Sequence, residues 1–253
     1  ASNKQPYFEA KPSQKEIDAL QQKHLAHNIK ELQRIFTIAA TANGPVHINI
    51  PMEEPLYGMT NTPIDFPVIP ELKPRVPETN YKELLSAWKS SKRKMILIGV
   101  AKPNAELATV LDTLLQDPSV VVFTEKTSNL SHPNAIGAID CLMAPLELEQ
   151  NGGEAELKPD LLLTLGGMIV SKKIKFFLRK HQALNHFHID QTKANDTFYY
   201  LSQHIHAPAE NILTALTEIS TTKSDYQFNI LSRYRNYLQK GKGYLSKIPF
   251  SDL

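Results

Sequence analysis

The chain has 253 residues, 42% of them hydrophobic, with 28 basic and 26 acidic side chains, a composition that predicts a soluble globular protein with one sizeable core. The net charge is near zero, and no stretch of the sequence interleaves basic with aromatic residues, which argues against a nucleic-acid partner. No apolar run approaches the ~18 residues of a membrane span. A single cysteine, Cys141, and the lack of a signal-peptide pattern favour the reducing cytoplasm.

Residues 1–51 predict one helix and one strand. Ser13 and Glu16 have capping-box spacing, and the helical pattern that follows places apolar residues on one face: Leu25, Ile29, Leu32, Phe36 and Ala39. Residues 46–50 alternate apolar and polar side chains, which predicts a strand that ends at Pro51. A lone strand leaves its ladder groups unpaired, so we expect these residues to be the C-terminal remnant of a larger domain.

Residues 52–77 predict a semi-rigid linker. Seven prolines lie between positions 51 and 77, at 51, 55, 63, 67, 70, 74 and 77. Proline removes a backbone donor and fixes φ, so neither a continuous helix nor a central strand fits this passage.

Residues 78–218 predict one α/β domain with a doubly wound, Rossmann-like parallel sheet. Apolar runs of strand length alternate with helical patterns; the strands are expected at 95–100, 120–123, 161–165, 186–190 and 200–204. Residues 124–160 read as a long loop containing Gly152 and Gly153. Strict alternation of strands and helices gives a parallel sheet covered on both faces.

Residues 219–253 predict a connector toward a further domain. A helix is expected from 226 to 239, followed by a glycine-containing break at 241–243. The last residues contain a helix N-cap signal, which predicts that another helix begins there. We therefore expect the sequence to be a piece of a longer protein.

The strand-to-helix loops are the expected ligand sites, because open parallel sheets bind ligands beyond the carboxyl ends of their strands. Gly166 and Gly167 lead into Ser171, Lys172 and Lys173, where a helix N-terminus and two cations would favour a carboxylate. A solvated pair of surface lysines explains the same residues equally well.

A second loop could add Ser128 and Asn129 to the same crevice, although turn chemistry alone also explains them. The loop after Gly99 lacks the GxGxxG spacing of a dinucleotide site. We therefore do not expect NAD or FAD, which argues against a dinucleotide-binding oxidoreductase.

Four histidines lie at i, i+2 spacing on apparent strands: His186, His188, His204 and His206. We interpret them as packed or surface residues, since a metal site would need further ligands brought from elsewhere. No GxSxG, Walker-type or HExxH motif occurs in the chain. The sequence predicts neither a metal site nor a catalytic residue within this chain.

Residues 44–57, GPVHINIPMEEPLY, resemble the strand that closes the pyrimidine-binding domain of thiamine-diphosphate-dependent enzymes. The run at 53–57 is most similar to the 2-succinyl-5-enolpyruvyl-6-hydroxy-3-cyclohexene-1-carboxylate (SEPHCHC) synthases of menaquinone biosynthesis. The resemblance implies that the chain carries the end of the first domain, the whole middle domain and the lead into the third.

The same resemblance implies a transferase that decarboxylates 2-oxoglutarate on thiamine diphosphate and Mg²⁺ and adds the succinyl carbanion to isochorismate, acting as a homo-oligomer. The activating glutamate and the Mg²⁺ motif of such enzymes lie outside the middle domain, so no cofactor and no activity are expected for this chain alone. Lys172 and Lys173 align with a basic pair implicated in substrate binding. The alternative that remains open is a non-catalytic ligand-sensing or assembly module.

Overall fold

The computed structural model describes residues 12–42, 44–51, 80–149 and 153–249. The chain forms two compact units, Ala1–Arg75 and Val76–Leu253, which are described separately. The predicted linker at 52–77 lies outside the described residues. The domain boundaries expected at 51, 77 and 218 stay predictions.

In the first unit, helix α1 runs from Gln14 to Ala42 and begins at the predicted capping box. The Ser13 backbone N–H donates to Glu16 Oε2 at 2.8 Å, and the Glu16 N–H donates to Ser13 Oγ at 3.4 Å. The predicted strand at 46–50 is wrong, because these described residues adopt no strand. Alternation of apolar residues gives a strand only where another strand completes its ladder.

The second unit is a six-stranded, all-parallel sheet with strand order β3-β2-β1-β4-β5-β6. The strands are β1 (Lys94–Ile98), β2 (Val120–Thr124), β3 (Ala135–Ile136), β4 (Leu161–Leu165), β5 (Asn185–Ile189) and β6 (Gln203–Ile205). Every residue of β1, β2 and β4 is buried, as their continuous apolar runs predict. The strand order reverses between β1 and β4, which is the switch point of a doubly wound sheet.

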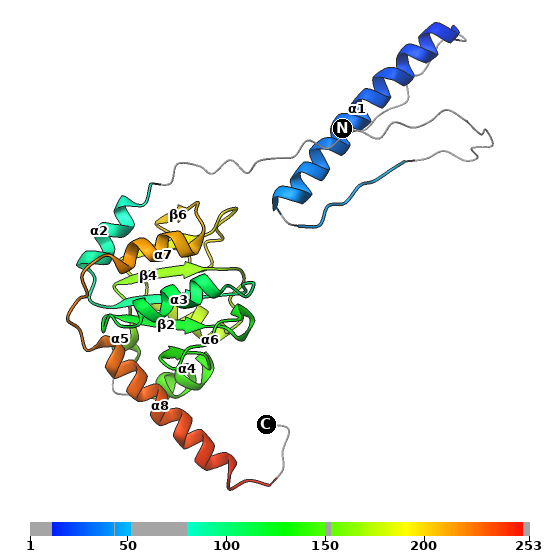
Figure 1. Ribbon diagram of the computed structural model, residues 1–253. Helices are drawn as coiled ribbons and strands as arrows, with labels where there is room; N and C mark the ends of the chain where they lie inside the picture. Colours follow the sequence, from blue (N-terminus) through cyan, green and yellow to red (C-terminus); the bar gives the residue numbers. More distant parts are fainter. Residues whose placement is uncertain (1–11, 43, 52–79, 150–152, 250–253) are drawn as a thin grey trace. The chain divides into compact units, whose positions relative to one another are not determined.

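Helices cover both faces of this sheet (Figure 1), so the predicted fold class is confirmed. One core lies under α2 (Lys82–Ser90), α3 (Ala105–Leu114) and α7 (Ala209–Thr217). The other lies under α4 (Ile139–Leu148), α5 (Gly153–Leu157), α6 (Lys172–Lys180) and α8 (Tyr226–Leu245). Each helix contributes an apolar stripe because its hydrophobic residues recur every three or four positions.

Three sequence-based boundaries need correction. The long loop predicted at 124–160 contains the short 3₁₀ helix Lys126–Ser128, together with β3, α4 and α5. The last strand, expected at 200–204, is shorter and shifted to Gln203–Ile205. Helix α8 continues through Gly241 and Gly243, since isolated glycines lower helix propensity without forbidding a helix. Its first turns pack on the sheet through Tyr226, Ile230, Leu231 and Tyr234.

Candidate functional site

At the switch point, the loops after β1 and β4 are hydrogen-bonded to each other. Gly99 N–H donates to the Leu165 carbonyl at 3.0 Å, and Gly167 N–H donates to the Val100 carbonyl at 2.7 Å. A Cβ on Gly99 would lie 2.3 Å from the Gly167 carbonyl oxygen, so this approach requires glycine. The N–H groups of Gly99 and Gly167, which could otherwise bind a phosphate, therefore bond the two loops to each other.

Gly166 and Gly167 line a cavity of about 70 Å³ at the carboxyl ends of β4 and β5. Gly166 has φ +77°, a conformation that favours glycine. His188, Asp190 and Lys193 line the same cavity, and sequence patterns had not placed Asp190 or Lys193 beside the glycine pair. Both follow β5, so only the β4–β5 pairing brings them here.

Ser171 is the N-cap of α6, as the sequence predicts, and its Oγ accepts from Ile174 N–H at 3.2 Å. Two carboxylates of the chain itself occupy the positions expected for an anion. Glu125 Oε1 accepts from the N–H groups of Val170 and Ser171 at 2.8 and 2.9 Å. Asp140, in the first turn of α4, accepts from Ser171 Oγ at 2.5 Å.

The two predicted lysines lie differently. Lys172 is exposed, and no ion pair to it occurs within the described part of the chain. Lys173 Nζ lies 2.5 Å from Glu147 Oε2, in the last turn of α4, and both side chains are about one-third exposed. The sequence places both cations at the start of α6, and among the described residues Lys173 has an internal carboxylate partner whereas Lys172 has none.

Ser128 and Asn129 hold their own loop together. Ser128 is fully buried, and its Oγ accepts from Leu130 N–H at 3.2 Å. Asn129 has φ 56° and donates from Nδ2 to the Ala101 carbonyl at 2.8 Å, which ties the loop after β2 to the loop after β1. Their neighbour Glu125, not these two residues, makes the contact to α6.

A groove of about 410 Å³ opens at the carboxyl ends of β2 and β3. Lys126 and His132 line it from the loops, and Tyr234 and Leu238 line it from α8. Ala138 N–H donates to the Tyr234 hydroxyl at 3.0 Å, which fixes the ring against the start of α4. Its volume is in the range of small-molecule sites, so this groove is a second candidate site.

The histidines of β5 and β6 are engaged within the fold. His186 Nε2 and His188 Nδ1 each lie 2.9 Å from Thr164 Oγ1, and His204 Nε2 donates to the Asp190 carbonyl at 2.9 Å. Burial lowers the pKa of His186 to about 4 and also lowers the pKa of His188. Within residues 12–42, 44–51, 80–149 and 153–249, no group of three or more His, Cys, Asp or Glu side chains could hold a metal ion.

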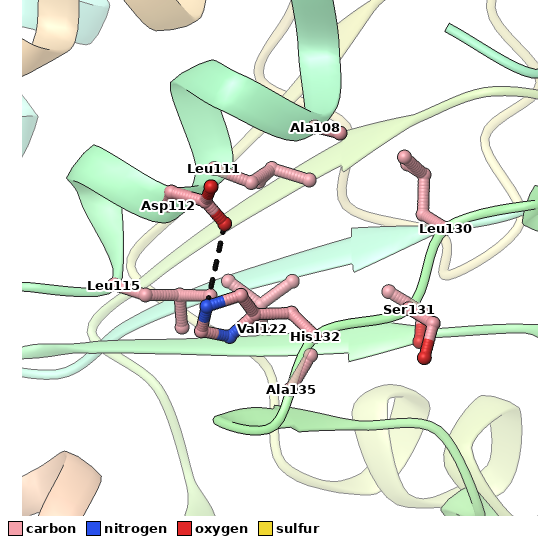
Figure 2. A pocket seen from close by; sticks show the side chains of 10 residues that line it. Ala108, Leu111, Asp112, Leu115, Val122, Leu130, Ser131, His132 and Ala135 are labelled. Atoms are coloured by element: carbon pink, nitrogen blue, oxygen red, sulfur yellow. Dashed lines mark ion pairs between the residues drawn. The ribbon is translucent and has the colours of Figure 1, made fainter. Parts of the chain in front are cut away.

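Ser131, His132 and Asp112 line a further pocket of about 20 Å³ (Figure 2). His132 Nδ1 accepts from Asn134 N–H at 3.0 Å, so the ring proton sits on Nε2, 3.3 Å from Asp112 Oδ1. In Figure 2 the Ser131 side chain lies apart from this ring. The three residues therefore do not form a nucleophile and base.

The family resemblance implies thiamine diphosphate and Mg²⁺. Among the described residues, no group of three or more His, Cys, Asp or Glu side chains could hold a metal ion, and the Gly167 N–H in the loop after β4 donates to the Val100 carbonyl. No helix of the described ranges is long and apolar enough to cross a membrane.

A scan against protein-family models finds no match. Among curated proteins, the chain is 42% identical over 231 residues to the SEPHCHC synthase of Flavobacterium johnsoniae, which covers 89% of this chain and 41% of that protein. The synthase of Flavobacterium psychrophilum is 38% identical over 236 residues, covering 90% and 42%. That of Christiangramia forsetii is 42% identical over 199 residues, covering 76% and 34%. The chain spans about two fifths of the length of the first two relatives.

Proposed function

The chain belongs to the SEPHCHC synthase family and spans about two fifths of the length of its relatives, and we propose that it serves as the middle part of such a synthase. The whole enzyme decarboxylates 2-oxoglutarate on thiamine diphosphate with Mg²⁺ and adds the succinyl unit to isochorismate in menaquinone biosynthesis. The observation that carries this proposal is the identity of about 40% along nine tenths of the chain.

In this proposal the chain contributes binding groups and leaves the chemistry to the cofactor and to other parts of the enzyme. Both substrates are dicarboxylates, and Lys172 and Lys173 open α6 at the carboxyl edge of the sheet behind the N-cap Ser171. Glu125 and Asp140 already occupy the backbone donors and the Ser171 hydroxyl at this helix N-terminus, so a carboxylate ligand would be held by the lysine ammonium groups. The exposure of Lys172 supports this role more directly than the paired state of Lys173.

Two assays test the proposal. First, CO₂ release from 2-oxoglutarate is measured with thiamine diphosphate, Mg²⁺ and isochorismate, for the 253-residue chain and for a full-length synthase that contains it. We expect turnover only from the full-length enzyme. Turnover by the chain alone, or none by the full-length enzyme, contradicts the proposal.

Second, Lys172→Ala and Lys173→Ala in the full-length synthase should each lower kcat/KM by about tenfold or more, which corresponds to ~1.4 kcal/mol of lost transition-state binding. Lys175→Ala, from the same helix, is the matched control. Unchanged kinetics for both variants would remove the pair from the substrate site.

The groove of about 410 Å³ favours a second candidate, a non-catalytic module that senses a pathway metabolite. Calorimetric titration of the chain with a naphthoate-type product separates the two. Saturable binding that is weakened by Lys126→Ala supports sensing, and the absence of heat and of a melting shift contradicts it.

A further inference from the structure

The N-terminal ends of α4 and α6 lie together, but the Lys173 ammonium pairs with a residue at the other end of α4. Asp140 in the first turn of α4 accepts from the Ser171 hydroxyl that caps α6. Glu147, which holds Lys173 Nζ at 2.5 Å, belongs to the last turn of the same α4 helix. A helix rises 1.5 Å per residue, so the backbone of Glu147 lies about 10 Å further along α4 than that of Asp140.

This ion pair is weak enough to exchange. The side chains of Lys173 and Glu147 are 38% and 30% exposed, and pairs that contact water in this way are screened. A lysine also has a flexible four-carbon stem with three rotatable donors. The ammonium can therefore exchange the Glu147 carboxylate for a carboxylate of the substrate.

We propose that Glu147 is an internal competitor for Lys173: it holds the ammonium away from the carboxyl edge of the sheet, and a dicarboxylate substrate must displace it. The inference rests on the proposed function, because it assigns Lys173 to the substrate. Glu147 itself does not contact the substrate and acts only by positioning Lys173.

The chain offers a matched control on the same helix. Lys180, the last residue of α6, pairs with Glu154 at 2.7 Å, and its side chain is also partly exposed. This second pair lies at the opposite end of α6 from Ser171. Removing the Glu154 charge therefore frees a lysine that is not at the proposed site.

The experiment compares steady-state kinetics of full-length synthase variants. Glu147→Gln should lower the KM for a dicarboxylate substrate by about two- to fivefold, the range that follows from the typical strength of an exposed ion pair. The kcat should stay unchanged, because the substitution frees a binding group without touching reacting atoms. Glu147→Asp, which keeps the charge but shortens its reach, should give a smaller decrease.

Glu154→Gln should leave KM unchanged. If Lys173→Ala raises KM but Glu147→Gln does not lower it, the competitor role is overturned and the proposed function stands. If Lys173→Ala leaves KM unchanged, the substrate role of Lys173 fails, and the inference fails with it. A loss of kcat in Glu147→Gln would assign Glu147 a role other than positioning and would also overturn the inference.

Discussion

Glu125 Oε1 lies 2.9 Å from the backbone nitrogen of Ser171, so a carboxylate from the loop after β2 occupies the N-terminus of α6. The same oxygen accepts from Val170 N–H at 2.8 Å. Hydrogen bonds from backbone donors to a charged oxygen are stronger than neutral ones, and they complement the helix dipole.

Glu125→Ala should therefore lower the free energy of unfolding by about 1–3 kcal/mol, because two backbone donors lose their acceptor. Glu125→Gln should cost less, since its amide oxygen still accepts. Urea denaturation followed by circular dichroism measures both variants. Lys126→Ala is the neighbouring control, and an equal effect of Lys126→Ala and Glu125→Ala would contradict the assigned role.

Gly99→Ala should destabilise the second unit by about 2 kcal/mol or more, because the new Cβ meets the Gly167 carbonyl oxygen at 2.3 Å. Gly243→Ala in α8 is the matched control. No atom lies within 4 Å of its added Cβ, and alanine favours a helix over glycine by up to about 1 kcal/mol. Thermal denaturation should thus show a lower Tm for Gly99→Ala only; equal Tm values would show that the loops separate readily.

Lys94 is fully buried in β1, where its ammonium contacts Asp117 at 3.0 Å and Ser119 Oγ at 2.9 Å. Asp117→Leu should lower the free energy of unfolding by about 3–5 kcal/mol, since it leaves a buried cation unpaired. Adding Lys94→Met to this variant should recover much of the loss. Urea denaturation of a double-mutant cycle gives the coupling.

Glu156→Gln provides the comparison for that cycle, because Glu156 pairs with Arg233 at 2.8 Å and is half exposed. We expect a change below about 1 kcal/mol there. If Asp117→Leu costs no more than Glu156→Gln, the buried pair does not stabilise the fold.

Stability should fall in mild acid because of His186. Burial lowers its pKa to about 4, whereas in the unfolded chain it is near 6.5, so the unfolded state binds the proton first. This contribution is fully present above pH 6.5 and is lost as pH decreases toward 4. The shift corresponds to a loss on the order of 3 kcal/mol.

Urea denaturation at several pH values between 7.5 and 4.5 should show this slope, and His186→Phe should reduce it, leaving the contribution of His188, whose pKa burial also lowers. His27→Gln, on an exposed position of α1, should leave the slope unchanged. An identical slope in wild type and His186→Phe would remove His186 as its source.

The sequence pattern predicted those helices and strands that depend on interactions between residues close together in the chain. The apolar run at 161–165 is strand β4 without any shift, and Ser171 caps α6 through a contact to Ile174, three residues away. The family resemblance at residues 44–57 predicted the relationship to the synthases. The histidines illustrate the limit, because their spacing does not reveal that Thr164 bridges two of them.

The sequence by itself thus determined the fold class, most helices and strands, and the two lysines that open α6. Only the tertiary structure decided what surrounds those lysines. Glu125 is 46 residues from Ser171, and Glu147 is 26 residues from Lys173. Periodicity reports which face of an element is buried, whereas these contacts depend on which strands and helices become neighbours after folding. The order of the parallel strands makes that choice, and it brings the internal carboxylates to the site.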